Sequence, residues 1–415
     1  MRRNSYALAA LAAAAVPGLN PARTVPVATP IDEFDVAGVI GEDGRRVLIT
    51  APSTTEAGVQ LEKELGVVDA LTGTSIAPLV APPVGYARLA EGGRAVVTEP
   101  PNGAPLMFDE LTEDVGLARS LGRVIARIHA VPAYVAEAAG AETYTAQAVR
   151  AGHRSQVHRA RQAGELPAAV SQRWETLLAD DDLWGFRPCF VHANLSEECL
   201  FTDGEQITGV TGWHEARSGD PAVDLAWLVS ALEPSLFDAL YAAYVSELPI
   251  APHARLVERA QAVGELAVVD WLLHGIDADD ETIVEDARGM LDDLDHDISQ
   301  LAREEAERAF DDLDDVSPGH GRAPVHEQAP AYEQAPDHAH EPAGATARTP
   351  GADVPETDRT DVEPSGEAWI ETAAPEDRAA DDRDRRPTYG LPADHSGSHA
   401  VGLGEAATLD AERDR

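Results

Sequence analysis

Residues 190–227, FVHANLSEECLFTDGEQITGVTGWHEARSGDPAVDLAW, contain the most informative pattern of the chain. His192 opens a polar loop directly after an apolar run, and the sequence TDGE at 202–205 predicts a tight turn. Asp220 followed by Pro221 predicts a helix start, with the aspartate as N-cap and the proline in the first helical position. The runs in this region with the composition of short β-strands are 189–192, 200–201 and 207–210.

Two positions in the loop that His192 opens have the spacing of a phosphoryl-transfer centre. In the protein-kinase pattern H-R-D-x-x-x-x-N, a catalytic aspartate follows two residues after the histidine, and a magnesium-binding asparagine follows five residues after that aspartate. In this chain those positions are Asn194 and Cys199. The spacing therefore favours the fold in which this pattern occurs, whereas the residue types argue against phosphoryl transfer.

Residues 1–100 are predicted to form a small β-rich lobe. Apolar, β-branched runs at 34–40 and 46–50 flank the sequence GEDG, which is a hairpin signal. The sequence STTE at 53–56 has the form of a capping box, and apolar residues at helical spacing follow it, so we expect a helix. The N-terminal sequence MRRNSYALAALAAAAVPG is short and weakly apolar for an export signal, and we interpret it as a short amphipathic helix. Further strand candidates are 80–89 and 94–98.

Residues 101–316 are predicted to form a mainly helical second lobe. One expected helix ends at His129 and carries a stripe of apolar residues: Leu117, Leu121, Val124 and Ile128. Other expected helices are 144–162, 168–178, 236–248, 253–275 and 281–310.

Residues 317–415 lack apolar periodicity and are rich in proline, alanine and acidic residues. This composition predicts a disordered acidic tail, which we interpret as a tether for a partner.

The composition excludes several classes of partner. The formal net charge of −41 argues against nucleic acid and against an anionic membrane surface. An acidic surface favours cationic ligands, although it also serves solubility. Two cysteines are too few for a secreted disulfide framework, and no segment is long and apolar enough to span a membrane, so we expect a cytoplasmic protein. Basic charge is carried by arginine except at Lys63.

Three sequences occur in order and at matching spacing: HANLSEEC, ITGVTGW and GDPAVDLAWL. They resemble the patterns H-G-D-L-x-x-x-N, I-x-G-V-I-D-W and G-D-P-x-x-D-L-A of the aminoglycoside and macrolide phosphotransferases. The sequence IARIH at 125–129 matches a helix end of that family, and EARSGDP at 215–221 is most similar to the actinobacterial macrolide 2′-phosphotransferases. The resemblance covers about residues 8–291. It implies a protein-kinase-like α+β fold, with a small β-rich N-lobe and a mainly helical C-lobe.

Four positions that this family uses for chemistry carry other residues here. The catalytic base position is Asn194, whose amide does not accept a proton at neutral pH. The two magnesium-ligand positions are Cys199 and Gly212, a soft thiol and a residue without a side chain. The basic residue expected on the third strand to hold nucleotide phosphates falls at Thr50. The helix glutamate that would pair with it is present as Glu64.

The family's loop-bracing residues, in contrast, are present as His192 and Asp224. This asymmetry predicts a catalytically impaired pseudokinase that acts as a binding or regulatory module for a small cationic molecule or a protein partner. The alternative is an active kinase that uses ATP or GTP with Mg²⁺ to phosphorylate a hydroxyl of a small cationic molecule such as a macrolide. In that case a carboxylate would have to replace Gly212 as metal ligand, and the candidates are Glu215, Asp203 and Asp220.

A zinc site is a competing interpretation of the same segment. Cys189, His192, Cys199 and His214 are close in sequence and are all zinc-ligand types. Their spacing is irregular, and Cys189 and His192 would point to opposite faces of an extended strand. These features favour a buried strand cysteine, a bracing histidine and an exposed turn histidine over a metal site.

Overall fold

The computed structural model describes residues 2–27 and 33–314. The tail predicted at 317–415 lies outside the described residues, so its predicted disorder stays a prediction. Helix α11 (Glu281–Asp314) crosses from one compact unit, which includes the chain up to Gln300, into a second that begins at Leu301. The fold and the site described below belong to the first unit.

The N-terminal lobe is built on a five-stranded antiparallel sheet with the order β1-β2-β3-β5-β4. The β2–β3 hairpin around GEDG and the next two strands confirm the sequence-based expectation. Strand β1 was not predicted, because its sequence PARTVP contains two prolines; it pairs on one side alone, as an edge strand with prolines does. The strands are β1 (Pro21–Pro26), β2 (Phe34–Gly41), β3 (Arg46–Pro52), β4 (Pro83–Arg88) and β5 (Arg94–Thr98).

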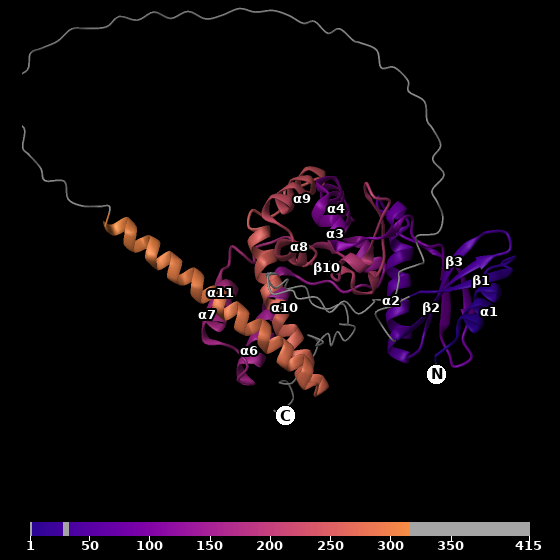
Figure 1. Cartoon of the computed structure of the whole chain (residues 1–415), viewed down its shortest axis with the longest axis horizontal. Coiled ribbons are helices and arrows are strands. Elements are labelled where there is room, and N and C mark those ends of the chain that lie inside the picture. Colours follow the sequence, from indigo (N-terminus) through magenta and orange to yellow (C-terminus); the bar gives the residue numbers. More distant parts are fainter. Residues whose placement is uncertain (1, 28–32, 315–415) are drawn as a thin grey trace, which may run out of the picture. The chain divides into compact units, whose positions relative to one another are not determined.

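Helices cover both faces of this sheet (Figure 1). The predicted N-terminal helix is α1 (Ser5–Ala15), which buries Leu8 and Ala12 in one cluster with alternate residues of β2 and β3. Helix α2 (Thr55–Leu71) buries Leu61 and Leu65 with Val96 on the opposite face. Thr54 caps α2 by accepting a hydrogen bond from the backbone of Ala57 at 3.1 Å, so the helix begins one residue later than the STTE capping box implies.

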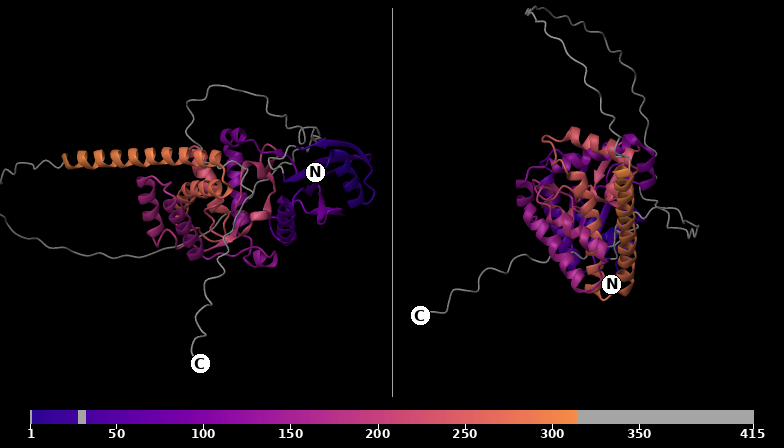
Figure 2. Two further views of the ribbon diagram at one scale, coloured as in Figure 1. Left: turned by 90° about the horizontal axis from the view of Figure 1, so that it is seen from below. Right: turned by 90° about the vertical axis from the view of Figure 1, so that its left-hand side faces the viewer.

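The C-terminal lobe is helical, as predicted, and lies beside the sheet lobe in the left view of Figure 2. Helices α4 (Val115–His129) and α9 (Pro234–Glu247) cross so closely that a Cβ on Gly122 would lie 2.2 Å from the carbonyl oxygen of Leu240. This close crossing fixes the position of α4 and therefore of His129 at its end. The remaining helices are α3 (Phe108–Glu113), α5 (Tyr134–Ala138), α6 (Ala146–Gln162), α7 (Ala168–Ala179), α8 (Ala226–Ala231) and α10 (Leu256–Ala278).

Short strands lie between the helices, and most of them belong to the segment around residues 190–227. Their pairing is antiparallel, with β7 next to β10 and β8 between β6 and β9. This arrangement brings the loop after β7 and the end of β9 together. The strands are β6 (Ala104–Pro105), β7 (Cys189–Val191), β8 (Leu200–Thr202), β9 (Ile207–Val210) and β10 (Arg217–Gly219). No helix of the described residues is long and apolar enough to cross a membrane.

The helix start predicted at Asp220 and Pro221 is wrong. Asp220 Oδ1 does accept a hydrogen bond from the backbone of Ala222 at 2.9 Å, as an N-cap would, but residues 221–225 form turns and α8 begins at Ala226. The physical reason lies in the two aspartates of this segment. Both carboxylates point into the protein, where Asp220 binds Arg259 and Asp224 binds the loop after β7, and a regular helix from Pro221 onward does not form.

Candidate functional site

The loop after β7 is held by a buried carboxylate. Asp224 is completely buried; its Oδ2 accepts a hydrogen bond from the backbone of His192 at 2.8 Å, and its Oδ1 accepts one from Ala193 at 2.7 Å. Ala193 has a positive φ of 66°, which is unfavourable for a residue with a Cβ. The two hydrogen bonds compensate for this strain, so Asp224 determines the shape of the loop.

His129, at the end of α4, lies between Asp224 and Tyr244. Its Nε2 is 3.1 Å from Asp224 Oδ2, and its Nδ1 is 2.9 Å from the Tyr244 hydroxyl. Burial would raise the pKa of Asp224, but hydrogen bonds from the His129 ring and from the His192 backbone lower it below its ordinary value. Asp224 is therefore ionised and serves as a buried anchor for loop, α4 and α9 together.

The His192 ring links the loop to the end of β9. Its Nε2 donates to the carbonyl oxygen of Thr211 at 2.8 Å, and the ring packs on Trp213 with centroids 4.7 Å apart. Burial lowers the pKa of His192, so the ring is neutral. Its Nδ1 is buried without a partner among the described residues. His192 therefore connects the loop to the end of β9 from a fully buried position, and its role as a loop brace stays a prediction.

Asn194, at the base position, is exposed at the tip of this loop. No hydrogen bond to its side-chain amide is present within the described residues, whereas its carbonyl oxygen lies 3.5 Å from Cys199 Sγ and accepts from that thiol. The amide is therefore not oriented by a hydrogen bond to any described residue.

The structure brings the two predicted metal positions together. A Cβ placed on Gly212 would lie 3.1 Å from Cys199 Sγ and 3.9 Å from His192 Cε1. Gly212 has a φ of 78°, in the left-handed region that disfavours other residues. Burial raises the pKa of the Cys199 thiol, so this sulfur is protonated and is a poor ligand for Mg²⁺. At the two positions where the family has oxygen ligands, this chain has the neutral thiol of Cys199 and the backbone of Gly212, which has no side chain.

Glu64 of α2 contacts this same point. Its Oε1 accepts hydrogen bonds from the backbone amides of Gly212 and Trp213, at 3.2 and 3.3 Å. Thr50 lies opposite Val96 in the β3–β5 register, on the sheet face that α2 covers. No hydrogen bond between Thr50 and Glu64 occurs in the described part of the chain. The carboxylate that would pair with a phosphate-binding lysine is instead bound to backbone.

The alternative metal ligands have other partners. Glu215, in the 3-10 helix η3 (Trp213–Glu215), lies 3.6 Å from Arg217, and Asp203 accepts backbone hydrogen bonds within its own turn. Asp220 is bound by Arg259. Among residues 2–27 and 33–314, no three His, Cys, Asp or Glu side chains are grouped to hold a metal ion, and this includes the set considered for zinc.

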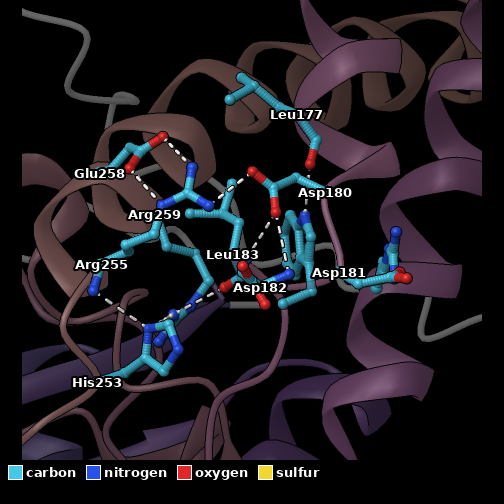
Figure 3. Close-up of polar contacts among 11 residues, drawn as sticks. Leu177, Asp180, Asp181, Asp182, Leu183, His253, Arg255, Glu258 and Arg259 are labelled. Atoms are coloured by element: carbon cyan, nitrogen blue, oxygen red, sulfur yellow. Dashed lines mark hydrogen bonds and ion pairs between the residues drawn. The ribbon is translucent and has the colours of Figure 1, made fainter.

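Sequence reasoning missed Arg259 of α10, which is fully buried beneath the site. Its Nε donates to both carboxylate oxygens of Asp220, at 3.0 and 2.9 Å, and its Nη1 donates to the carbonyl oxygen of Leu183 at 3.0 Å. Figure 3 shows the adjoining network, in which Arg255 joins Asp180 to Glu258. Arg259 lies three residues after Leu256 and four before Val263, on the apolar side of the expected helix, and this placement was the one available signal for a buried ion pair.

Comparison with known proteins agrees with this geometry. The sheet lobe, the helical lobe and the braced loop define the class of kinase-like phosphotransferases. Residues 32–256, more than half of the chain, match the family model described as "Phosphotransferase enzyme family", and the chain belongs to this family. No curated protein matches the chain at a significant level.

Solved structures of phosphotransferases have the same fold. The macrolide 2′-phosphotransferase MphH from Brachybacterium faecium, an apoenzyme, is 25% identical, with a TM-score of 0.61 over 69% of this chain and 97% of that one. A macrolide 2′-phosphotransferase type I is 21% identical, with a TM-score of 0.56 over 70% and 98%. The GDP complex of aminoglycoside 2′-phosphotransferase-IIIa is 15% identical, with a TM-score of 0.58 over 71% and 99%. The predicted resemblance and fold class are confirmed.

Proposed function

We propose that this member of the phosphotransferase family binds ligands without carrying out magnesium-dependent phosphoryl transfer. The observation that carries the proposal is the contact between the two metal positions, where the Gly212 backbone lies against Cys199 Sγ. A magnesium ion requires oxygen ligands in near-octahedral geometry at about 2.1 Å. A protonated thiol and a glycine supply none, and the residues present do not fit the metal.

The base position supports the same conclusion. Removing a general base typically lowers a rate by about 10²–10⁴, and no hydrogen bond joins the Asn194 side chain to a carboxylate among the described residues. Phosphoryl transfer depends mainly on positioning and on neutralising charge, and metal ions supply much of that neutralisation. Loss of the base together with both metal positions therefore removes more than one contribution to the reaction.

The retained contacts support a role in binding. Asp224, His129 and His192 hold the loop, and Glu64 holds α2 against it, although no substrate chemistry remains for the loop to perform. Such contacts preserve a shaped surface. The strongly acidic chain and the fold shared with macrolide phosphotransferases favour a small cationic molecule such as a macrolide as the ligand.

The competing function is an active ATP- or GTP-dependent kinase in which Glu215 replaces the missing ligand. The side chain of Glu215 is 26% exposed, and its ion pair with Arg217 is long, so a metal could compete for it. A kinase of this kind would still have no catalytic base at position 194.

Calorimetry with GTP and ATP, with and without Mg²⁺, separates the two functions. We expect any nucleotide affinity to be the same, within about twofold, in the presence and absence of Mg²⁺. A tenfold or greater gain with Mg²⁺ that Glu215→Gln abolishes would support the kinase. A matched control is Glu205→Gln, which changes an exposed turn carboxylate and should leave both isotherms unaltered.

A further inference from the structure

A small hollow lies where α2 meets η3 and the loop at 139–142. Its charged and polar lining comes from three separate parts of the chain: Lys63, Glu142, His214, Glu215 and Arg217. Lys63 is the one lysine of the sequence. The base and metal positions discussed above, Asn194, Cys199 and Gly212, do not line it.

The acidic members of this hollow already have partners. The Tyr144 hydroxyl donates to Glu142, and Glu215 forms its ion pair with Arg217. Lys63 and His214, in contrast, have no hydrogen bond or ion pair to any residue that the structure describes. Lys63 and His214 are therefore the two unpaired donors of the lining, whereas each of its two carboxylates already contacts a neighbouring side chain.

We propose that this hollow binds a small oxyanion, a phosphate or a carboxylate group, between Lys63 and His214. Acidic residues outnumber basic ones by 73 to 32 in this chain, so a concave site with free basic side chains is unusual in it. The Lys63 ammonium supplies charge-assisted hydrogen bonds, and the His214 imidazole supplies a second donor. Arg217 also lines the hollow, but it is already paired with Glu215.

The position of the hollow couples it to the hydrogen bond between α2 and η3. Lys63 directly precedes Glu64, and His214 directly follows Trp213, whose backbone amide Glu64 binds at 3.3 Å. An anion that contacts both Lys63 and His214 adds a second connection between the same two elements. Anion binding therefore stabilises the contact of α2 with η3, and this holds whether or not nucleotide binds elsewhere.

The lysine count makes a direct test possible. Protein grown with ¹³C-lysine gives side-chain signals from Lys63 alone, which can be followed by NMR during titration with inorganic phosphate and, separately, with sodium acetate. Ionic strength is held constant with sodium chloride. We expect a saturable shift of the Lys63 Cε–Hε signal with at least one of the two anions, and the more effective anion identifies the preferred group.

Two variants decide whether the response is local. His214→Ala should weaken the apparent affinity about tenfold, because it removes one of two donors. Arg88→Gln, which removes an exposed positive charge from β4, should leave the affinity unchanged. A linear, non-saturating shift with both anions would overturn the proposal. An affinity that is the same in the His214→Ala variant would overturn it as well.

Discussion

The carboxylate of Glu64 accepts a hydrogen bond from the backbone amide of Gly212 at 3.2 Å, across 148 residues of sequence. A glutamate at this position of a kinase-like fold is expected to pair with a strand lysine, and here a backbone amide takes that role. The contact joins α2 of the sheet lobe to the backbone around Gly212 in the helical lobe.

Glu64→Ala should lower the free energy of unfolding by about 1–3 kcal/mol, because two backbone amides lose a charged acceptor. Chemical denaturation of the purified variant measures this. Glu62→Ala, on the same helix, removes an exposed ion pair with Arg94 and should cost less than about 1 kcal/mol. An equal loss of unfolding free energy in the two variants would show that the Glu64 contact stabilises the protein no more than an exposed ion pair does.

Gly212→Asp alone should destabilise the protein by about 1–3 kcal/mol. The new Cβ meets Cys199 Sγ at 3.1 Å, and the backbone there has a positive φ. Combining it with Cys199→Asn and Asn194→Asp restores the family's residues, and we expect Mg²⁺-dependent nucleotide binding in the triple variant. Residues that act as a unit are not additive, so each single change should restore little. A folded triple variant without such binding would mean that the loss extends beyond these three side chains.

Tyr244→Phe should cost about 1–2 kcal/mol, because it leaves buried His129 Nδ1 without its partner. Tyr241→Phe is the matched control, since its ring stacks on Tyr244 but no hydrogen bond to its hydroxyl is present among the described residues. Its stability should change by less than about 0.5 kcal/mol. Thermal unfolding monitored by circular dichroism distinguishes the two variants, and similar melting temperatures would contradict a bracing role for Tyr244.

Stability should fall as the pH drops below about 6.5, because two histidines are held neutral in the folded chain. Burial, with a smaller effect of nearby Arg217, lowers the pKa of His153 from 6.5 to about 4, and burial also lowers the pKa of His192. The unfolded chain takes up these protons first, so the stabilisation is complete above pH 6.5 and is lost toward pH 4. Each histidine contributes up to about 1.4 kcal/mol per pH unit in this window. Urea denaturation between pH 7.5 and 4.5 tests this, and a His153→Gln variant with an unchanged slope would contradict it.

Local sequence signals predicted the elements whose pattern lies within a few residues. The β2–β3 hairpin follows from GEDG between two apolar runs, and α4 follows from its apolar stripe. The juxtaposition of Cys199 and Gly212 followed from the resemblance, because motif spacing carries three-dimensional information once a family is known.

Contacts between distant residues were not predictable in this way. The Asp220–Arg259 ion pair spans 39 residues, and nothing near Asp220 shows that its carboxylate turns inward instead of starting a helix. Strand β1 was not predicted because proline normally argues against a strand. Its position at the edge of the sheet permits the pairing with β2. In both cases tertiary context outweighed the local preference.

A single-turnover phosphotransfer assay is the sharpest test of the proposed lack of phosphoryl transfer. The protein, in excess over γ-labelled ATP or GTP, is incubated with Mg²⁺ and a panel of macrolides and aminoglycosides, with Asn194→Ala as the matched variant. We predict no labelled antibiotic above the level of the protein-free reaction, because Asn194, Cys199 and Gly212 provide neither base nor metal ligand. Labelled product that forms with the natural chain and disappears with Asn194→Ala would show that the site is catalytic and would contradict the proposal.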